Sequence, residues 1–125
     1  MKIRIRGNHL RFRLRQQDVA ALFSNGSVCE KIEFGTMPDE QISFILERSD
    51  VKSLIVVFRH NIVRVSVPGH ILDEWMHTGM VGFEKEVITG NKRIGILVEK
   101  DFACLDANEE DNIGAYPNPA ADCAK

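Results

Sequence analysis

Arginine residues recur at alternate positions near the start of the chain, and this spacing could bind an anion. The opening KIRIRGNHLRFRLR has positive side chains at every second residue on both sides of Gly7-Asn8. Guanidinium groups donate paired hydrogen bonds to phosphate or carboxylate oxygens. The sequence therefore predicts an anion-binding surface whose candidate residues are Arg4, Arg6, Arg11, Arg13, Arg15, Arg59 and Arg64.

The same arginines have an interpretation without a ligand. Alternating charges are typical of the solvated face of an antiparallel sheet, where ion pairs link neighbouring strands. Nine basic and five acidic side chains fall on the polar side of the expected strands, although the whole chain carries a net charge of -2. The further members of this side are Lys2, Lys31, Glu33, Glu47, Glu84, Glu86 and Glu99. The sequence thus predicts one basic face on an acidic body.

Three of these glutamates are also a candidate metal site. Glu84, Glu86 and Glu99 could hold Mg²⁺ through carboxylate oxygens. They could equally serve as ion-pair partners of the arginines. His70 and His77 are seven residues apart, too far along a helix to share a metal directly, so we expect surface or capping roles for the histidines. No cofactor is predicted.

The familiar catalytic motifs are missing. The chain contains no P-loop, GxSxG elbow, HExxH or GxGxxG. Its three cysteines are odd in number and form no CxxC pair, which indicates a reducing compartment and a cytoplasmic protein. We expect Cys29 and Cys104 to be buried as small apolar residues, Cys123 to be exposed in the tail, and Trp75 to pack in the core.

An internal repeat predicts the elements that position these residues. Residues 3–34 align without a gap on residues 56–87, and residues 42–49 align on residues 94–101. Identical pairs include Arg6/Arg59 and Arg11/Arg64, and in most other aligned pairs an apolar residue aligns with an apolar residue. A repeat of this length indicates two copies of one supersecondary unit.

Each copy has the pattern of a hairpin, a short helix and a second hairpin. Period-two alternation predicts the strands, and apolar residues at i, i+3 and i+4 predict the helices. The helices are expected at about 16–24 and 69–77, each ended by a glycine, Gly26 or Gly79. Their buried stripes are Val19, Leu22 and Phe23 in the first copy and Leu72, Trp75 and Met76 in the second.

These elements predict an α+β fold of two ββαββ units, with about eight mostly antiparallel strands and two short helices. The units span about 2–48 and 54–101 within a single domain, 1–105. Eight strands at about 4.8 Å spacing are wider than two helices of about 10 Å diameter can cover. The sheet should therefore curve or close into a barrel, or the repeats should face each other as two layers, or a second subunit should cover the remainder.

The last twenty residues differ from the rest. Residues 106–125 are acidic, irregular and rich in Ala, Asn and Pro, and Tyr116-Pro117 could dock extended on the domain. We expect neither a signal peptide nor a membrane span at the charged start of the chain. The net negative charge argues against a general nucleic-acid binder.

Two resemblances add to this interpretation. VEKDFACLD (98–106) followed by an acidic segment and YPNP (116–119), together with KIRIRGNHLRFRL, resembles a family of small uncharacterised bacterial proteins. That resemblance implies a bacterial origin and assigns no catalytic residue. The duplicated architecture is similar, more weakly, to the triphosphate tunnel (CYTH-like) enzymes, whose eight-stranded barrel has charged walls and an ExExK motif. The nearest strings here are Glu84-Lys85-Glu86 and Glu99-Lys100.

Three functions are therefore open at this point. The leading one is a non-enzymatic binding or regulatory protein whose basic strand face takes a small anionic molecule or an acidic protein. The second is a metal-dependent phosphoanhydride hydrolase of the tunnel type, with the arginines on phosphate and the glutamates on Mg²⁺. The third is a structural module that forms a homodimer through apolar strand surface.

Overall fold

The computed structural model describes residues 1–102 and 114–117. Eight strands and two helices lie in this part of the chain. Their order is β1 (Lys2–Arg6), β2 (His9–Leu14), α1 (Gln16–Asn25), β3 (Ser27–Glu33), β4 (Gln41–Ser49), β5 (Ile55–Arg59), β6 (Ile62–Pro68), α2 (Gly69–His77), β7 (Gly82–Thr89) and β8 (Lys92–Lys100). The α+β class, both helices and all four hairpins agree with the prediction.

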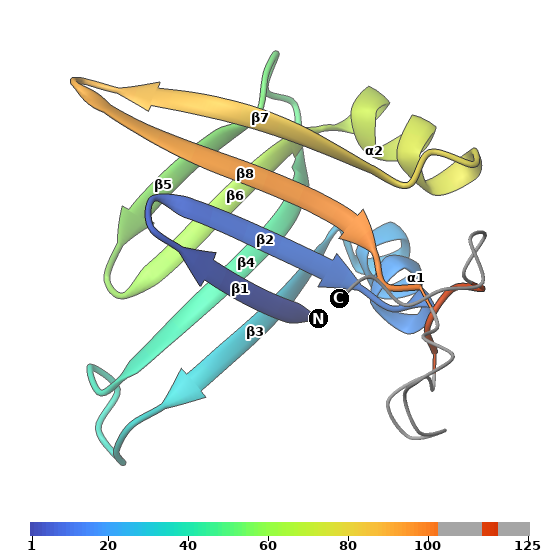
Figure 1. Ribbon diagram of the computed structural model, residues 1–125. Coiled ribbons are helices and arrows are strands. Elements are labelled where there is room, and N and C mark those ends of the chain that lie inside the picture. The colour runs from blue at the N-terminus through green and yellow to red at the C-terminus, as the bar shows by residue number, and fades with distance from the viewer. Residues whose placement is uncertain (103–113, 118–125) are drawn as a thin grey trace.

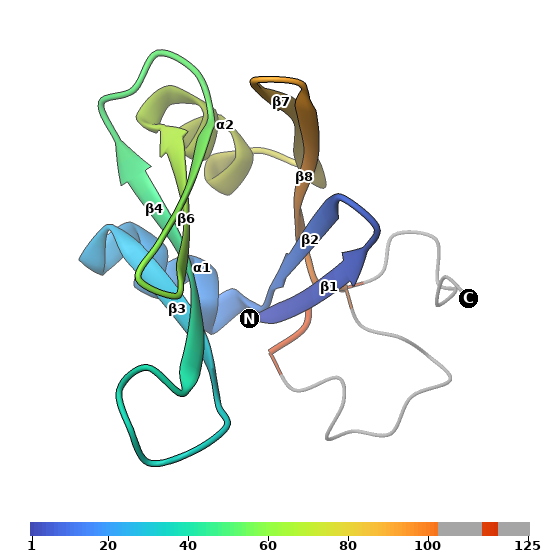
Figure 2. The same ribbon diagram turned by 90° about the vertical axis from the view of Figure 1, so that its left-hand side faces the viewer.

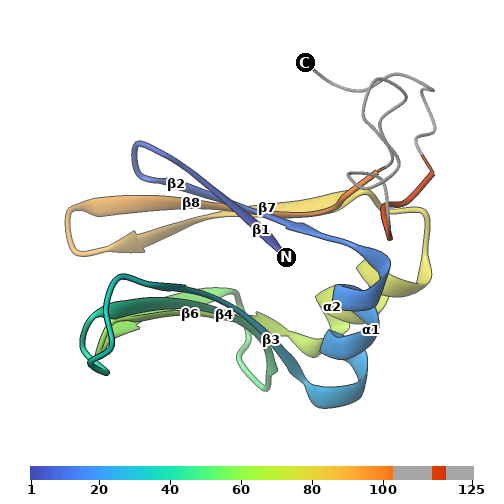
Figure 3. The same ribbon diagram turned by 90° about the horizontal axis from the view of Figure 1, so that it is seen from below.

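The strands form two separate four-stranded sheets that face each other (Figure 1, Figure 3). The first sheet has the order β1-β2-β8-β7, and the second has the order β3-β4-β6-β5. In each sheet two antiparallel hairpins meet at a central parallel pair, β2 with β8 or β4 with β6. Both helices lie at one end of the two layers, and all four hairpin connections lie at the other (Figure 3).

The predicted curved sheet or barrel was wrong, because the strands form two open sheets. The alternative in which one repeat faces the other was also wrong. After each first hairpin, a helix carries the chain across to the opposite layer, so the first hairpin of one half pairs with the second hairpin of the other half. Each layer therefore contains strands from both halves.

The two sheets share the register of their parallel pairs. Leu10 faces Ile96 in the first sheet, and Val63 faces Phe44 at the aligned position of the second. The outer hairpins differ, because Leu46 of β4 faces Val28, whereas the aligned Val98 of β8 faces Phe83 rather than Val81. The connection from α2 to β7 is longer than the one from α1 to β3, so the ungapped alignment is two residues out of register along β7.

The core lies between the sheets and is closed by the helices at one end. Its fully buried side chains include Phe12, Leu14, Leu46, Val65, Leu72, Trp75, Ile96 and Val98. Because side chains alternate along a strand, these residues fix which face of each sheet points inward. The predicted helical stripes are correct for Val19, Leu22, Leu72 and Trp75, whereas Phe23 is 62% exposed and was wrongly assigned to the core.

The two helices end differently. Gly26 has a φ of 81° and donates its N–H to the carbonyl of Leu22 at 3.0 Å, which is the predicted left-handed stop. The second helix ends at Thr78 in an extended conformation, so the same prediction for Gly79 was wrong. The Thr78 hydroxyl instead donates to the Glu74 carbonyl at 2.6 Å.

Residues 114–117 pack against the domain beside the start of α1. Tyr116 donates its backbone N–H to the carbonyl of Asp101 at 2.6 Å, and Gln16 donates to the carbonyl of Gly114 at 2.7 Å. The Tyr116 ring lies 5.4 Å from Lys100 Nζ. Burial raises the pKa of Tyr116 and lowers that of Lys100. The docking expected for Tyr116 is therefore present, whereas Cys104 and Cys123 lie outside the described residues.

No helix in the described ranges is long and apolar enough to cross a membrane. Cys29 is exposed on β3, contrary to the expectation that it is buried.

Candidate anion-binding surface

The first sheet brings the N-terminal cations together on its outer face. Phe12 and Leu14 of β2 point into the core, so Arg11 and Arg13 point outward. Pairing with β1 then creates two rows of like charge across the hairpin, Lys2 opposite Arg13 and Arg4 opposite Arg11, and a third row that places Arg6 opposite His9. These residues, with Arg15 at the end of β2, are called the arginine surface below.

Two carboxylates neutralise part of the arginine surface. Glu99, on the neighbouring β8, accepts a hydrogen bond from Arg11 Nε at 2.5 Å and lies 3.2 Å from Arg13 Nε. Asp101 is only 4% exposed, and Lys2 Nζ, Arg13 Nη2 and Arg15 Nε lie 3.2, 3.5 and 3.9 Å from its carboxylate oxygens. The ion-pair interpretation therefore holds at the helix end of the surface.

Positive charge remains without an ion-pair partner at the end of the arginine surface that lies away from the helices. Six cations stand against two carboxylates, and within residues 1–102 and 114–117 neither Arg4 nor Arg6 has a carboxylate partner. Both side chains are exposed. Like charges directly opposite each other destabilise a hairpin. The row of Arg4 and Arg11 is therefore a place where an added anion would be stabilising.

Arg59 and Arg64 do not belong to the arginine surface. They lie on β5 and β6 of the second sheet, and their side chains point outward on the other side of the molecule. Arg64 donates to Glu47 at 2.6 Å, and Glu47 also accepts a hydrogen bond from the Ser66 hydroxyl at 2.8 Å. The prediction of one continuous basic face was wrong for these two arginines, because it assumed that all strands share a sheet.

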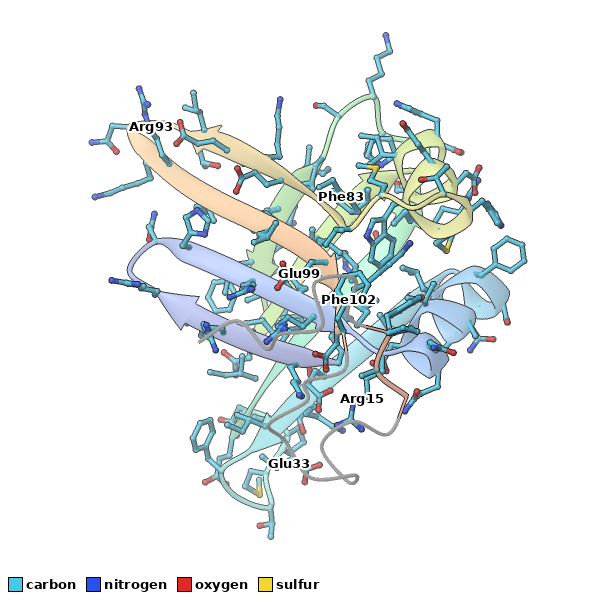
Figure 4. The ribbon with its side chains drawn as sticks, turned by 45° about the vertical axis from the view of Figure 1, so that its right-hand side comes forward. Arg15, Glu33, Phe83, Arg93, Glu99 and Phe102 are labelled. Atoms are coloured by element: carbon cyan, nitrogen blue, oxygen red, sulfur yellow. The ribbon has the colours of Figure 1, made fainter. Side chains whose placement is uncertain are left out.

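The polar residues of β3 are separated from the arginine surface for the same reason. Lys31 and Glu33 are in the second sheet, and Figure 4 shows Glu33 at the end of β3, far from Glu99 on β8. In the same view Arg15 and Arg93 mark opposite ends of the first sheet (Figure 4).

The three glutamates proposed as a metal site do not form one. Glu99 is held by Arg11 and Arg13, and Glu84 lies opposite Leu97 on the far strand β7. In the described part of the chain, no three His, Cys, Asp or Glu side chains are arranged to hold a metal ion. The charged walls of a tunnel are also missing, because the two sheets stay separate.

The outer face of the first sheet contains a hollow that the sequence did not predict. It has a volume of about 420 Å³ and lies between His9 on the basic strands and Glu84 and Glu86 on β7. Gly95 forms its floor, and a Cβ at that position would collide with the imidazole of His9. Gly95 occupies an outward position of β8 between Arg93 and Glu99, and this missing side chain was the signal in the sequence that could have indicated the hollow. The face therefore has a positive half and a negative half, separated by this hollow.

Residues 1–120 match a family of unknown function (DUF7009). The chain belongs to this family. The match covers both sheets, both helices and the docked Tyr116, so it agrees with the expected resemblance to an uncharacterised family. The chain matches no curated protein and no solved structure. Because DUF7009 carries no assigned activity, a function for this member has to be argued from its geometry.

Proposed function

We propose that the chain is a non-enzymatic, cytoplasmic binding or regulatory protein whose arginine surface binds an anionic ligand. The observation that carries the proposal is the placement of Arg4 and Arg6 beside Arg11 and His9, where neither Arg4 nor Arg6 forms an ion pair with a carboxylate of the described residues. The pairing places one cation directly opposite another in two rows and the His9 imidazole opposite Arg6 in the third, which supplies donors from two strands to one ligand.

A second observation supports the same surface. Arg13 Nε is buried and has no partner that meets hydrogen-bond geometry, and the same holds for Asp101 Oδ2. Buried polar atoms without hydrogen bonds are destabilising. A phosphate over Arg4 and Arg11 would reduce the repulsion among the guanidinium groups that surround the Arg13 Nε atom. Phosphate-containing small molecules therefore fit the surface better than neutral ligands.

The test is a thermal-shift titration with tripolyphosphate. The unmodified protein should gain about 2.7 kcal/mol at a ligand concentration one hundred times Kd, which raises Tm by roughly 4 °C for each kcal/mol. The triple variant Arg4→Gln, Arg11→Gln, Arg13→Gln should lose this gain. Arg4→Gln alone should lose part of it, and since Arg4 has no described partner, this variant separates binding from folding.

The matched control for this titration is the double variant Arg59→Gln, Arg64→Gln. It removes two exposed or half-exposed arginines from the opposite side of the molecule. Its ligand-induced shift should equal that of the unmodified protein. Equal shifts in the triple variant and the unmodified protein would refute the proposal.

A homodimer is a second candidate, and one surface favours it. The outer face of the second sheet carries a group of apolar side chains on β4, β6 and β5, with Ile45, Ile62, Ile55 (39% exposed) and Val57 (41% exposed) around the Arg64–Glu47 pair. Its edge strand β5 has unpaired backbone groups.

We expect light scattering to give twice the chain mass, and Val57→Asp to give the mass of one chain. A single-chain mass for the unmodified protein at micromolar concentration would refute this candidate.

A further inference from the structure

An apolar pocket lies between the two sheets at the end away from the helices. Its volume is about 320 Å³, and its walls include Ile5, Leu10, Phe44, Val56, Phe58 and Val63. A second pocket of about 320 Å³ shares Ile5 and Phe44 and extends along the side between β1 and β3. The two together are called the inter-sheet pocket below. Figure 2 shows the two layers from the side on which the hairpin connections lie.

The walls of the inter-sheet pocket are core positions that nothing covers. Alternation along β1 and β5 directs Ile5 and Phe58 toward the opposite sheet, yet these side chains are 63% and 64% exposed. Ile32, which lines the side pocket, is 52% exposed. Scattered apolar residues on a surface need no explanation, but residues that converge on one concave space indicate a binding site.

Both halves of the chain contribute equivalent walls. In the sequence alignment, Ile5 corresponds to Phe58, Leu10 to Val63 and Ile42 to Ile94, and all six line the pocket. The opening therefore does not result from one displaced hairpin. It lies where the inward faces of the two central strand pairs run past the region filled by the helices.

The chemistry of the walls and the mouth is different. The walls of the first pocket carry no Asp, Glu, Lys or Arg side chain, so a ligand with many polar groups would leave those groups without hydrogen bonds there, whereas Glu30 and Lys31 line the side pocket. The strand ends beside the connections at this end carry Arg6, Arg59, Lys92 and Arg93, of which Arg93 donates a hydrogen bond to Glu86 at 3.1 Å, and His9 lines the pocket itself. The acidic residues at this end include Glu33, Asp39 and Glu40, and Glu40 already accepts a hydrogen bond from the Met37 N–H at 3.1 Å.

We propose that the inter-sheet pocket binds a single-chain fatty acid, with the acyl chain between the sheets and the carboxylate at the basic mouth. Each volume is at the lower end of the range for ligand pockets, about 300–1,000 Å³. An acyl chain makes no hydrogen bonds and suits these walls. The acyl-chain site lies on the opposite face of β1 and β2 from the arginine surface, and the two share only Arg6 and His9 at the hairpin end, so the inference goes beyond the proposed function and does not rest on it.

The experiment is calorimetric titration of the full chain with laurate and decanoate below their critical micelle concentrations. The Kd should fall about fourfold for each added methylene. Phe58→Asp, which places a carboxylate in the pocket, should raise the Kd for laurate at least tenfold. Val57→Asp is the matched control, because it is the next residue on the same strand and points to the outer face. It should leave the Kd within twofold.

A second measurement uses the unmodified chain and so does not depend on how the variants fold. Laurate should shift the methyl NMR signals of Ile5, Ile42, Val63 and Ile94 and leave those of Val57 unchanged. Saturable binding that the triple arginine variant retains would separate this site from the arginine surface.

Four results would overturn the inference. They are no saturable laurate binding, equal losses in Phe58→Asp and Val57→Asp, binding to phosphatidylglycerol vesicles without binding to free laurate, and a dimer that only Phe58→Asp dissociates. The last two would assign the pocket to a membrane surface or to a second copy of the chain.

Discussion

Replacing Trp75 by alanine is expected to lower the free energy of unfolding by about 3–5 kcal/mol. The Trp75 side chain is fully buried, contacts the ring of Phe83 edge-on at 5.6 Å, and donates its indole N–H to the carbonyl of Val81 at 3.0 Å. Removing it leaves a cavity at the place where α2 closes the space between the sheets, and it takes one of two donors from the Val81 carbonyl, which keeps the Lys100 N–H at 3.0 Å. Since small domains have only about 5–15 kcal/mol of stability, this loss should be visible in urea unfolding.

Phe23→Ala is the matched control for the Trp75 experiment. Phe23 lies on α1, where the sequence predicted a buried residue, but its side chain is 62% exposed and only touches the ring of His77. Its removal should change the unfolding free energy by no more than about 0.5 kcal/mol. Similar losses in both variants would show that α1 and α2 pack differently from the structure described above.

Asp101→Asn is expected to lower the free energy of unfolding by about 1–2 kcal/mol at low salt. The buried carboxylate faces Lys2, Arg13 and Arg15, and the amide would remove the opposite charge from Lys2 and Arg15 and leave Arg13 with Glu99 alone. Their side chains are 51%, 25% and 27% exposed, so solvent screening keeps the loss below that of a fully buried pair. Urea unfolding at two salt concentrations should show that added salt reduces the loss.

The same variant also tests the arginine surface. If an anion can take the place of the missing carboxylate, tripolyphosphate should stabilise Asp101→Asn by more than it stabilises the unmodified protein. A ligand-induced shift equal to or smaller than that of the unmodified protein would contradict this.

Asp73→Asn is the matched control for the charge change. Asp73 accepts two hydrogen bonds from Arg48, at 2.7 and 2.9 Å, and these lower the pKa of the Asp73 carboxyl. This pair lies on α2 and β4, outside the arginine surface. The variant should therefore show no extra response to tripolyphosphate.

Local patterns explain why much of the fold could be predicted. Alternation identified β1 and β2, since Leu10, Phe12 and Leu14 are inward and Arg11 and Arg13 are outward. Helical spacing located both helices within a residue or so. These signals depend on neighbours a few positions apart, and such neighbours are fixed by backbone geometry.

Long-range pairing explains what could not be predicted. Charged and apolar residues alternate around Arg59 and Arg64 as clearly as they do around Arg6 and Arg11. This alternation does not specify which sheet a strand joins. The partner of β6 is β4, from the other half of the chain, and this sends Arg64 to the opposite surface. The hollow over Gly95 and the inter-sheet pocket were missed for the same reason, since both need strands that are distant in sequence.

The sequence by itself determined the order of the ten elements, the inward and outward residues of most strands, and the excess of arginine in the first hairpin. Tertiary structure alone decided that the hairpins of each half separate into different sheets, that Glu99 and Asp101 reach the arginines, and that a pocket remains between the layers. Side-chain alternation is a property of one strand. Pairing between distant strands depends on how the whole chain buries its apolar surface.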